Sequence, residues 1–152
     1  MVLTGNPDEI REKLLQVAHA ELGTSDSRSY WLGALGSYPG TKFAWCGIFA
    51  LWCLKRLELC DWKWVVGKGF LYRLPRTTDP KPGDVAYFDK PYQHHALVQQ
   101  VEGDQLYLIQ GNYGVPGRVA ESVCSISAKK PVFFSVAQLV ADRLAKVNST
   151  GE

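Results

Sequence analysis

The sequence predicts one domain of the α+β class. Apolar residues recur at helical spacing in the first third of the chain and at every second position after residue 84, so helices precede strands. The chain has 152 residues, 46% of them apolar, and a chain of this length can bury a core without disulfide or metal staples. We expect the domain to span residues 1–146 and residues 147–152 to be a frayed tail.

The first helix is expected over residues 7–22. Asn6 stands where an N-cap accepts a backbone N–H, a proline follows at the first helical position, and Gly23 ends the apolar repeat. The next segment is rich in serine, glycine and tyrosine, which predicts a loop with a short helical turn around residues 31–35.

A second helix, over residues 43–59, is expected at the centre of the domain. Its residues are apolar on every side until Lys55, which is the pattern of a buried helix, and Thr41 is its expected cap. Residues 61–83 combine tryptophans, prolines and glycines and predict a long connection with little regular structure. Connections of that length are usually functional.

An antiparallel sheet is expected in the second half of the chain. Gly103-Asp104 is placed as a two-residue turn between neighbouring strands, and Ser135 as the cap of a last short helix. The expected strands are 85–88, 95–101, 105–110, 118–125 and 131–134.

Charge and cysteine spacing exclude several functional classes. The net charge of +2 lacks the concentrated basic field of a nucleic-acid binder. The four cysteines show no CxxC pair and no zinc-finger spacing, and Cys46 and Cys53 would lie too far apart along a helix for a disulfide. We therefore expect reduced thiols, no structural metal and no cofactor.

The N-terminal residues lack the basic and apolar parts of a secretory signal, and no run of about 18 apolar residues offers a membrane span. We therefore expect a protein made in the cytoplasm, without membrane insertion. If it acts outside the cytoplasm, another agent must carry it there.

Cys46 is the candidate nucleophile. It falls in the first turns of the expected buried helix, where unpaired N–H groups and the helix dipole stabilise a thiolate, which predicts a lowered pKa. Packing is the alternative role, because free cysteines are among the most buried residues. A catalytic Cys46 would need a base.

The hairpin around Gly103-Asp104 supplies that base. A two-residue turn places His95 opposite Asn112, with Gln110 on the same face of the sheet. A thiol, a histidine and a carboxamide that orients it form an activated cysteine nucleophile. His94 competes for the role of base, but neighbouring strand residues face opposite ways, and the register selects His95.

Four short motifs follow in order: AWCGIFALWC, PKPGDVAYF, HHALVQQV and LIQGN. Together they resemble the CHAP family, the cysteine- and histidine-dependent amidohydrolases/peptidases of phage lysins and bacterial cell-wall enzymes. The resemblance covers about residues 44–112. It implies a papain-like fold in which the nucleophile heads a helix packed on an antiparallel sheet.

The resemblance also implies roles for single residues. Cys46 falls on the nucleophile, His95 on the general base and Asn112 on the residue that orients it. Many members carry glutamate two residues before that asparagine, where this chain has Gln110. A neutral amide can hold the imidazole but stabilises its positive charge less than a carboxylate would.

Aromatic residues are the expected contacts to substrate. Tryptophans alternate with basic residues between Asp61 and Arg76, and these side chains either cover the core or form a groove wall that stacks on sugar rings. The expected substrate-binding residues are Trp45, Trp62, Trp64 and Tyr113.

The resulting hypothesis is a monomeric cysteine-dependent peptidoglycan hydrolase, an amidase or endopeptidase that cuts an amide of the stem peptide or cross-bridge. It would act in the periplasm or cell wall, as a phage-type lysin released by a holin or as an antibacterial effector carried by a secretion apparatus and matched by an immunity protein. The alternatives are a non-catalytic module that binds the wall or a partner, and a cysteine peptidase or deamidase that acts on protein.

Overall fold

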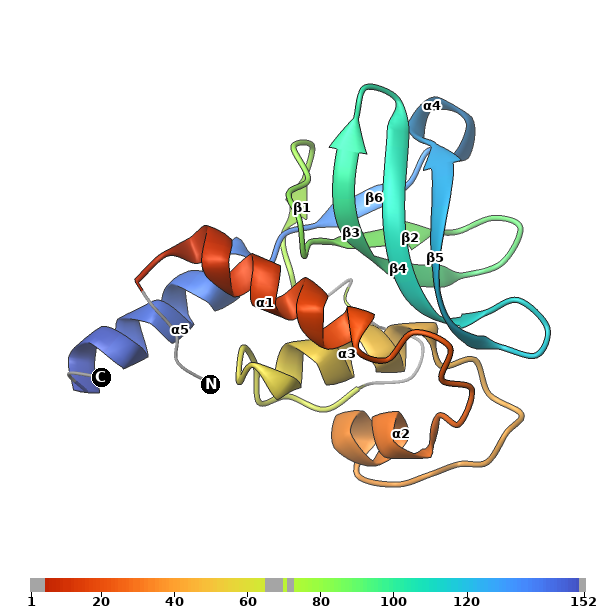
Figure 1. Cartoon of the computed structure of the whole chain (residues 1–152), viewed down its shortest axis with the longest axis horizontal. Coiled ribbons are helices and arrows are strands. Elements are labelled where there is room, and N and C mark those ends of the chain that lie inside the picture. The colour runs from red at the N-terminus through yellow and green to blue at the C-terminus, as the bar shows by residue number, and fades with distance from the viewer. Residues whose placement is uncertain (1–4, 65–69, 71–72, 151–152) are drawn as a thin grey trace.

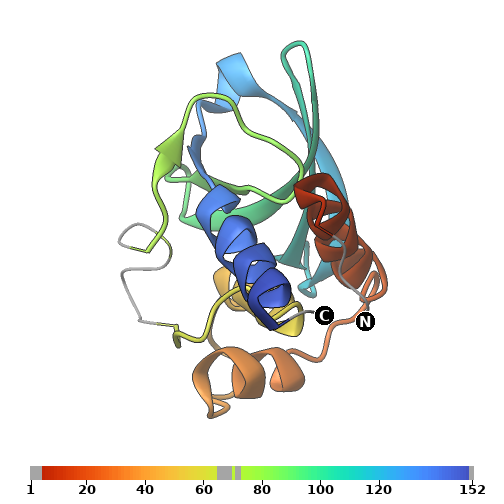
Figure 2. The same ribbon diagram turned by 90° about the vertical axis from the view of Figure 1, so that its left-hand side faces the viewer.

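Helices cover one face of an antiparallel sheet in this computed structural model, which describes residues 5–64, 70 and 73–150 (Figures 1 and 2). The helices are α1 (Pro7–His19), α2 (Arg28–Leu35), α3 (Cys46–Arg56), α4 (Ile126–Lys129) and α5 (Ala137–Thr150). The strands are β1 (Arg76–Thr77), β2 (Val85–Phe88), β3 (His94–Glu102), β4 (Gln105–Tyr113), β5 (Arg118–Ser125) and β6 (Val132–Phe134). Their order across the sheet is β1-β6-β2-β3-β4-β5. The α+β prediction is confirmed.

Local sequence signals explain where α1 begins and ends. The Asn6 side chain accepts a hydrogen bond from the Asp8 N–H at 2.9 Å, as expected of an N-cap. The helix ends at His19, three residues before the expected end, because Glu21 and Leu22 donate to carbonyls only three residues back.

The central helix α3 is shorter than predicted. It begins at Cys46, and its N-cap is Trp45, whose side chain makes no capping bond. The prediction of Thr41 as the cap is therefore wrong. The burial is as expected, since Ile48, Phe49 and Leu51 are each at most 1% exposed. Helices α1 and α2 pack beside α3 on the same face of the sheet (Figure 1).

The other elements differ from the predictions mainly at their ends. Strands β2 and β5 match their expected ranges, while β4 continues three residues further, to Tyr113. The Ser135 hydroxyl accepts a bond from the Ala137 N–H at 3.1 Å at the start of α5. This helix continues to Thr150, past residue 147, where the sequence predicts frayed chain. No helix in the described ranges has both the length and the apolar character to cross a membrane.

A β-bulge in β3 changes the predicted register. The expected turn is present, since Glu102 pairs with Gln105 and Gln100 pairs with Tyr107. Val98 then pairs with Leu108, so the intervening Gln99 is an extra residue on β3. All residues of β3 before the bulge are displaced by one position relative to β4. A shift of one position exchanges the faces on which strand residues lie.

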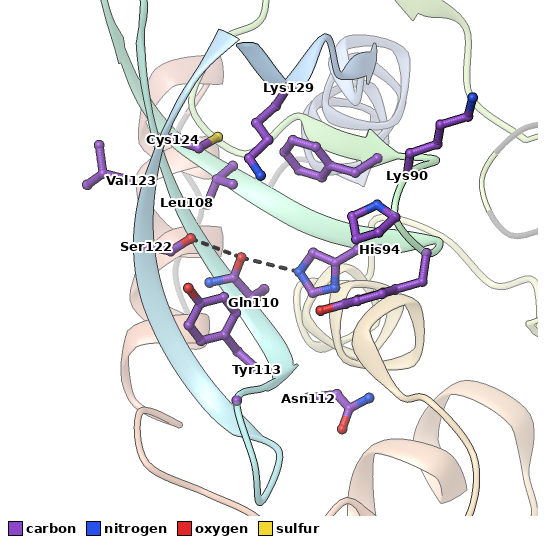
Figure 3. Close-up of a pocket in the computed structure, with 14 residues that line it drawn as sticks. Lys90, His94, Leu108, Gln110, Asn112, Tyr113, Ser122, Val123, Cys124 and Lys129 are labelled. Atoms are coloured by element: carbon purple, nitrogen blue, oxygen red, sulfur yellow. Dashed lines mark hydrogen bonds between the residues drawn. The ribbon is translucent and has the colours of Figure 1, made fainter.

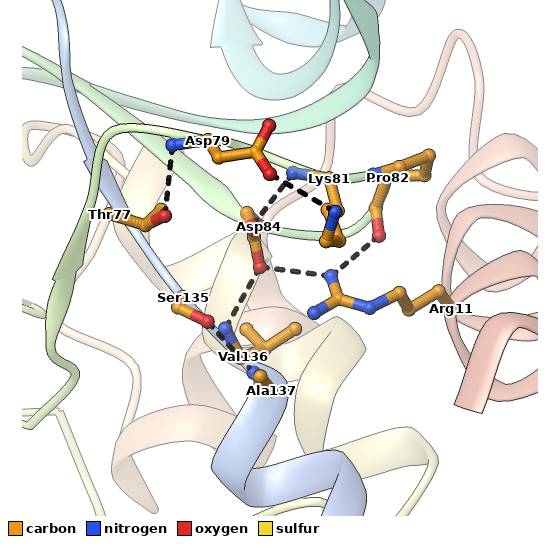
Figure 4. A network of polar contacts seen from close by, with 9 residues as sticks. All are labelled: Arg11, Thr77, Asp79, Lys81, Pro82, Asp84, Ser135, Val136 and Ala137. Carbon is orange, nitrogen blue, oxygen red and sulfur yellow. Dashed lines mark hydrogen bonds and ion pairs between the residues drawn. The ribbon is translucent and has the colours of Figure 1, made fainter.

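A buried ion pair joins three distant parts of the chain (Figure 4). The Arg11 guanidinium donates to the Asp84 carboxylate and to the Pro82 carbonyl, each at 2.9 Å. The same carboxylate accepts the Val136 N–H at 2.9 Å and the Lys81 N–H at 2.8 Å. Asp84 is 1% exposed. The aspartate of the PKPGDVAYF motif therefore fastens α1 and the approach to α5 to the start of β2.

Replacing Asp84 with alanine is expected to lower the free energy of unfolding by about 3–5 kcal/mol, because Arg11 would remain buried without its counterion. Urea unfolding measures this loss. Asp79→Ala is the matched control, since the Asp79 side chain is 85% exposed, and it should change stability by about 0.5 kcal/mol or less. Equal losses in the two variants would contradict the structural role of Asp84.

Candidate active site

Cys46 occupies the first position of α3 and is 6% exposed. Its Sγ accepts a hydrogen bond from the His95 N–H at 3.5 Å, so the sulfur lies beside the peptide that joins His94 and His95. Burial raises the pKa of the thiol, and the N–H groups of His95, Gly47 and Cys46 offset only part of this effect. The expectation of a lowered pKa is therefore wrong. In this structure the thiol is protonated at neutral pH.

Two glycines allow the start of α3 to lie close against its neighbours. A Cβ at Gly111 of β4 would stand 2.6 Å from the Phe49 Cβ and 2.7 Å from the Trp45 ring, so only glycine fits there. A Cβ at Gly47 would collide with the Trp64 ring. Cys46 is thus held between the sheet and an aromatic cover.

His95 faces α3 and is packed among aromatic rings. The rings of Trp64, Phe70 and Tyr87 have their centroids within 5.0–5.6 Å of the imidazole centroid. The His95 Nε2 is buried and has no hydrogen-bond partner among the described residues. Burial, with a smaller contribution from the charge of His94, lowers the pKa of His95 to about 4. His95 is therefore a neutral, aromatic-packed side chain.

The predicted pairing of His95 with Asn112 and Gln110 does not occur, because the bulge at Gln99 displaces β3 by one residue. His94 instead lies on the same face as Gln110, and the His94 Nε2 is 3.3 Å from the Gln110 Oε1 (Figure 3). Gln110 therefore orients the neighbouring histidine and not the predicted one.

The amide of Gln110 is fixed on both sides. Its Nε2 donates to the Ala120 carbonyl at 2.9 Å, and its Oε1 accepts from the Ser122 hydroxyl at 3.2 Å. The side chain is 1% exposed. Because the Oε1 can only accept, the Nε2 of a neutral His94 carries the proton in this contact, and the His94 Nδ1 is then an acceptor. Burial lowers the pKa of His94, and the bond to Gln110 offsets part of that change.

Asn112 takes no part in this contact. It has a φ of +55°, at an irregularity between β4 and β5, and its side chain packs against Gly117. Figure 3 shows it apart from the pair formed by His94 and Gln110.

A groove of about 510 Å³ opens on the sheet face opposite α3. His94, Gln110 and Asn112 line it together with two exposed tyrosines, Tyr92 and Tyr113. Cys46 is not among the described lining residues. The Cys46 sulfur contacts the backbone N–H of His95, the residue that follows His94 on β3.

Three of the four predicted aromatic contacts lie away from this groove, and only Tyr113 lines it. Trp45 is 5% exposed and stacks on Tyr30 in the core. Trp64 packs on Phe70 and His95. The tryptophans cover the core here, which was one of the two predicted roles.

Trp62 lines a separate cavity between the end of α3 and α5. Lys68 and Tyr72, which belong to the same stretch of sequence, lie outside the described residues. All four cysteines are free, as expected.

Comparison with known proteins points to the same family as the sequence motifs. Residues 38–112 match the family model described as CHAP domain. The resemblance to the CHAP family is confirmed. The CHAP segment contains Cys46, His94, His95 and Gln110, and it ends at Asn112.

Two solved structures of Ly7917 share the fold, one of them determined with "the hydrolyzing product of MDP". They have TM-scores of 0.51 and 0.52 at 14% identity and cover 82% and 83% of this chain. The match spans 62% of the Ly7917 chain, and at this identity it shows the fold alone. The comparison with curated proteins found no relative.

Proposed function

We propose that this protein is a cysteine-dependent hydrolase of peptidoglycan that cleaves an amide bond. The observation that carries the proposal is the position of the Cys46 sulfur, beside the peptide bond that precedes His95, while His94 is held by Gln110. The match of residues 38–112 to the CHAP family model supports a hydrolase. The Ly7917 structure with the product of MDP supports a wall-derived substrate.

In the proposed mechanism His94 replaces His95 as the general base. The Nδ1 of His94 removes the thiol proton while the sulfur attacks the amide carbonyl. The backbone N–H groups at the start of α3 stabilise the oxyanion. The proton passes to the leaving amine, and water then hydrolyses the thioester to release the acid and the free thiol.

The two reacting side chains are both neutral in this structure. Burial raises the pKa of Cys46 and lowers the pKa of His94, and each shift disfavours the charged form. We therefore propose that proton transfer from the thiol to His94 accompanies the attack. A lysin or an injected effector would both suit such an enzyme, and both roles place its action at the cell wall.

Digestion of purified peptidoglycan tests the proposal. We expect soluble fragments, and mass spectrometry names the bond: release of whole stem peptides from the glycan indicates an amidase, and cut peptides indicate an endopeptidase. Co-sedimentation with intact peptidoglycan and no fragments would contradict the proposal and favour a binding module. Cleavage of a denatured protein substrate alone would favour a protein-directed peptidase.

A further inference from the structure

The groove beside His94 has a marked excess of positive charge. Two lysines, Lys90 and Lys129, line it, and no carboxylate does so among the described residues. In Figure 3 the Lys129 side chain points into the groove toward Gln110, whereas the Lys90 side chain extends away from it. Burial raises the pKa of Cys124, another lining residue, and the charge of Lys129 offsets part of that change.

The backbone of Lys129 is positioned by the Gly103-Asp104 turn, which joins β3 and β4 at the end of the hairpin away from His94. The Asp104 carboxylate accepts bonds from the Ser127 N–H and the Ser127 hydroxyl, each at 2.9 Å, and thereby anchors α4. The Ser125 hydroxyl accepts the Ala128 N–H at 3.2 Å. Lys129 follows directly and forms no ion pair with a described acidic side chain.

We propose that Lys129 binds a carboxylate of the substrate, so that the groove selects anionic peptides. The proposal rests on the proposed function, since the groove is the one lined by the proposed base. An ammonium that points into the groove and forms no ion pair with a described acidic side chain can give a substrate carboxylate a charge-assisted hydrogen bond. The peptide would lie along the groove, with its amide near His94 and its carboxylate at α4.

Direct binding tests this assignment without relying on turnover. Calorimetry on the Cys46→Ala protein would compare soluble wall peptides with free carboxylates and the same peptides after conversion of those carboxylates to amides. We expect Lys129→Gln to weaken binding of the free acid by about five- to tenfold. The amidated peptide should bind weakly and equally to both proteins.

Lys130→Asn is the matched control. It removes the neighbouring charge, and asparagine tolerates the left-handed backbone that Lys130 adopts, with φ +49°. This variant should bind the free acid like its parent. Equal losses at positions 129 and 130, or an unchanged affinity in Lys129→Gln, would overturn the carboxylate site. Failure of the wild-type protein to cut peptidoglycan would overturn the proposed function, and the binding result would still decide the role of Lys129.

Discussion

Replacing Cys46 with alanine is expected to abolish peptidoglycan hydrolysis, with a fall in rate of at least about 10⁴-fold, because no other group can form the thioester. The fold should persist, since the change removes one sulfur from the first turn of α3. Initial rates of fragment release measure the activity, and circular dichroism with thermal unfolding measures the fold.

Cys53→Ala and Cys60→Ala are the controls for that experiment. Cys53 is fully buried in the core, and Cys60 lines the cavity near α5, so neither thiol reaches the groove. Both variants should retain the wild-type rate, although Cys53→Ala should cost some stability. Turnover that survived in Cys46→Ala would refute the cysteine mechanism.

Replacing His94 with alanine is expected to lower kcat by about 10²–10⁴-fold, the usual contribution of a general base. His95→Phe should retain activity, because phenylalanine fits among the surrounding rings and leaves the backbone N–H that contacts Cys46 in place. It should also retain stability, since it removes a buried Nε2 without a described partner. The opposite ranking would restore His95 as the base.

The pH dependence provides a second test of His94. Activity requires the neutral imidazole and falls as the pH drops through the pKa of His94, which burial places below its usual 6.5. Gln110→Glu should raise the pKa of His94 and so move the acid limb of the pH–rate profile to higher pH. It should also lower stability by about 1–3 kcal/mol, because a carboxylate oxygen would face the Ala120 carbonyl. An unchanged acid limb would show that position 110 does not sense the base.

The fold class and most elements could be predicted because they depend on local patterns. The Asn6 cap, the alternation in Val85–Phe88 and the buried character of α3 all depend on neighbouring residues. The turn at Gly103-Asp104 was predictable for the same reason. The helix ends were less predictable, since Trp45 starts α3 through tertiary packing and has no capping side chain.

The sequence predicted which residue types form the candidate site, but not which histidine contacts the carboxamide of Gln110. The sequence identifies Cys46 and a carboxamide two positions before Asn112. It does not reveal the bulge at Gln99, which decides whether His94 or His95 meets that carboxamide. Lys129 was missed because it lies far along the chain from the motifs and reaches the groove only through the packing of α4.

The ion pair between Arg11 and Asp84 limits how this protein can be divided or grafted. The segment that matches the family model, 38–112, contains Asp84 but neither Arg11 nor the Val136 N–H. A chimaera that placed this segment in a host without an equivalent of Arg11 would bury the Asp84 carboxylate without its cation. Recombination between relatives should therefore keep α1, the sheet and the start of α5 together as one inherited block.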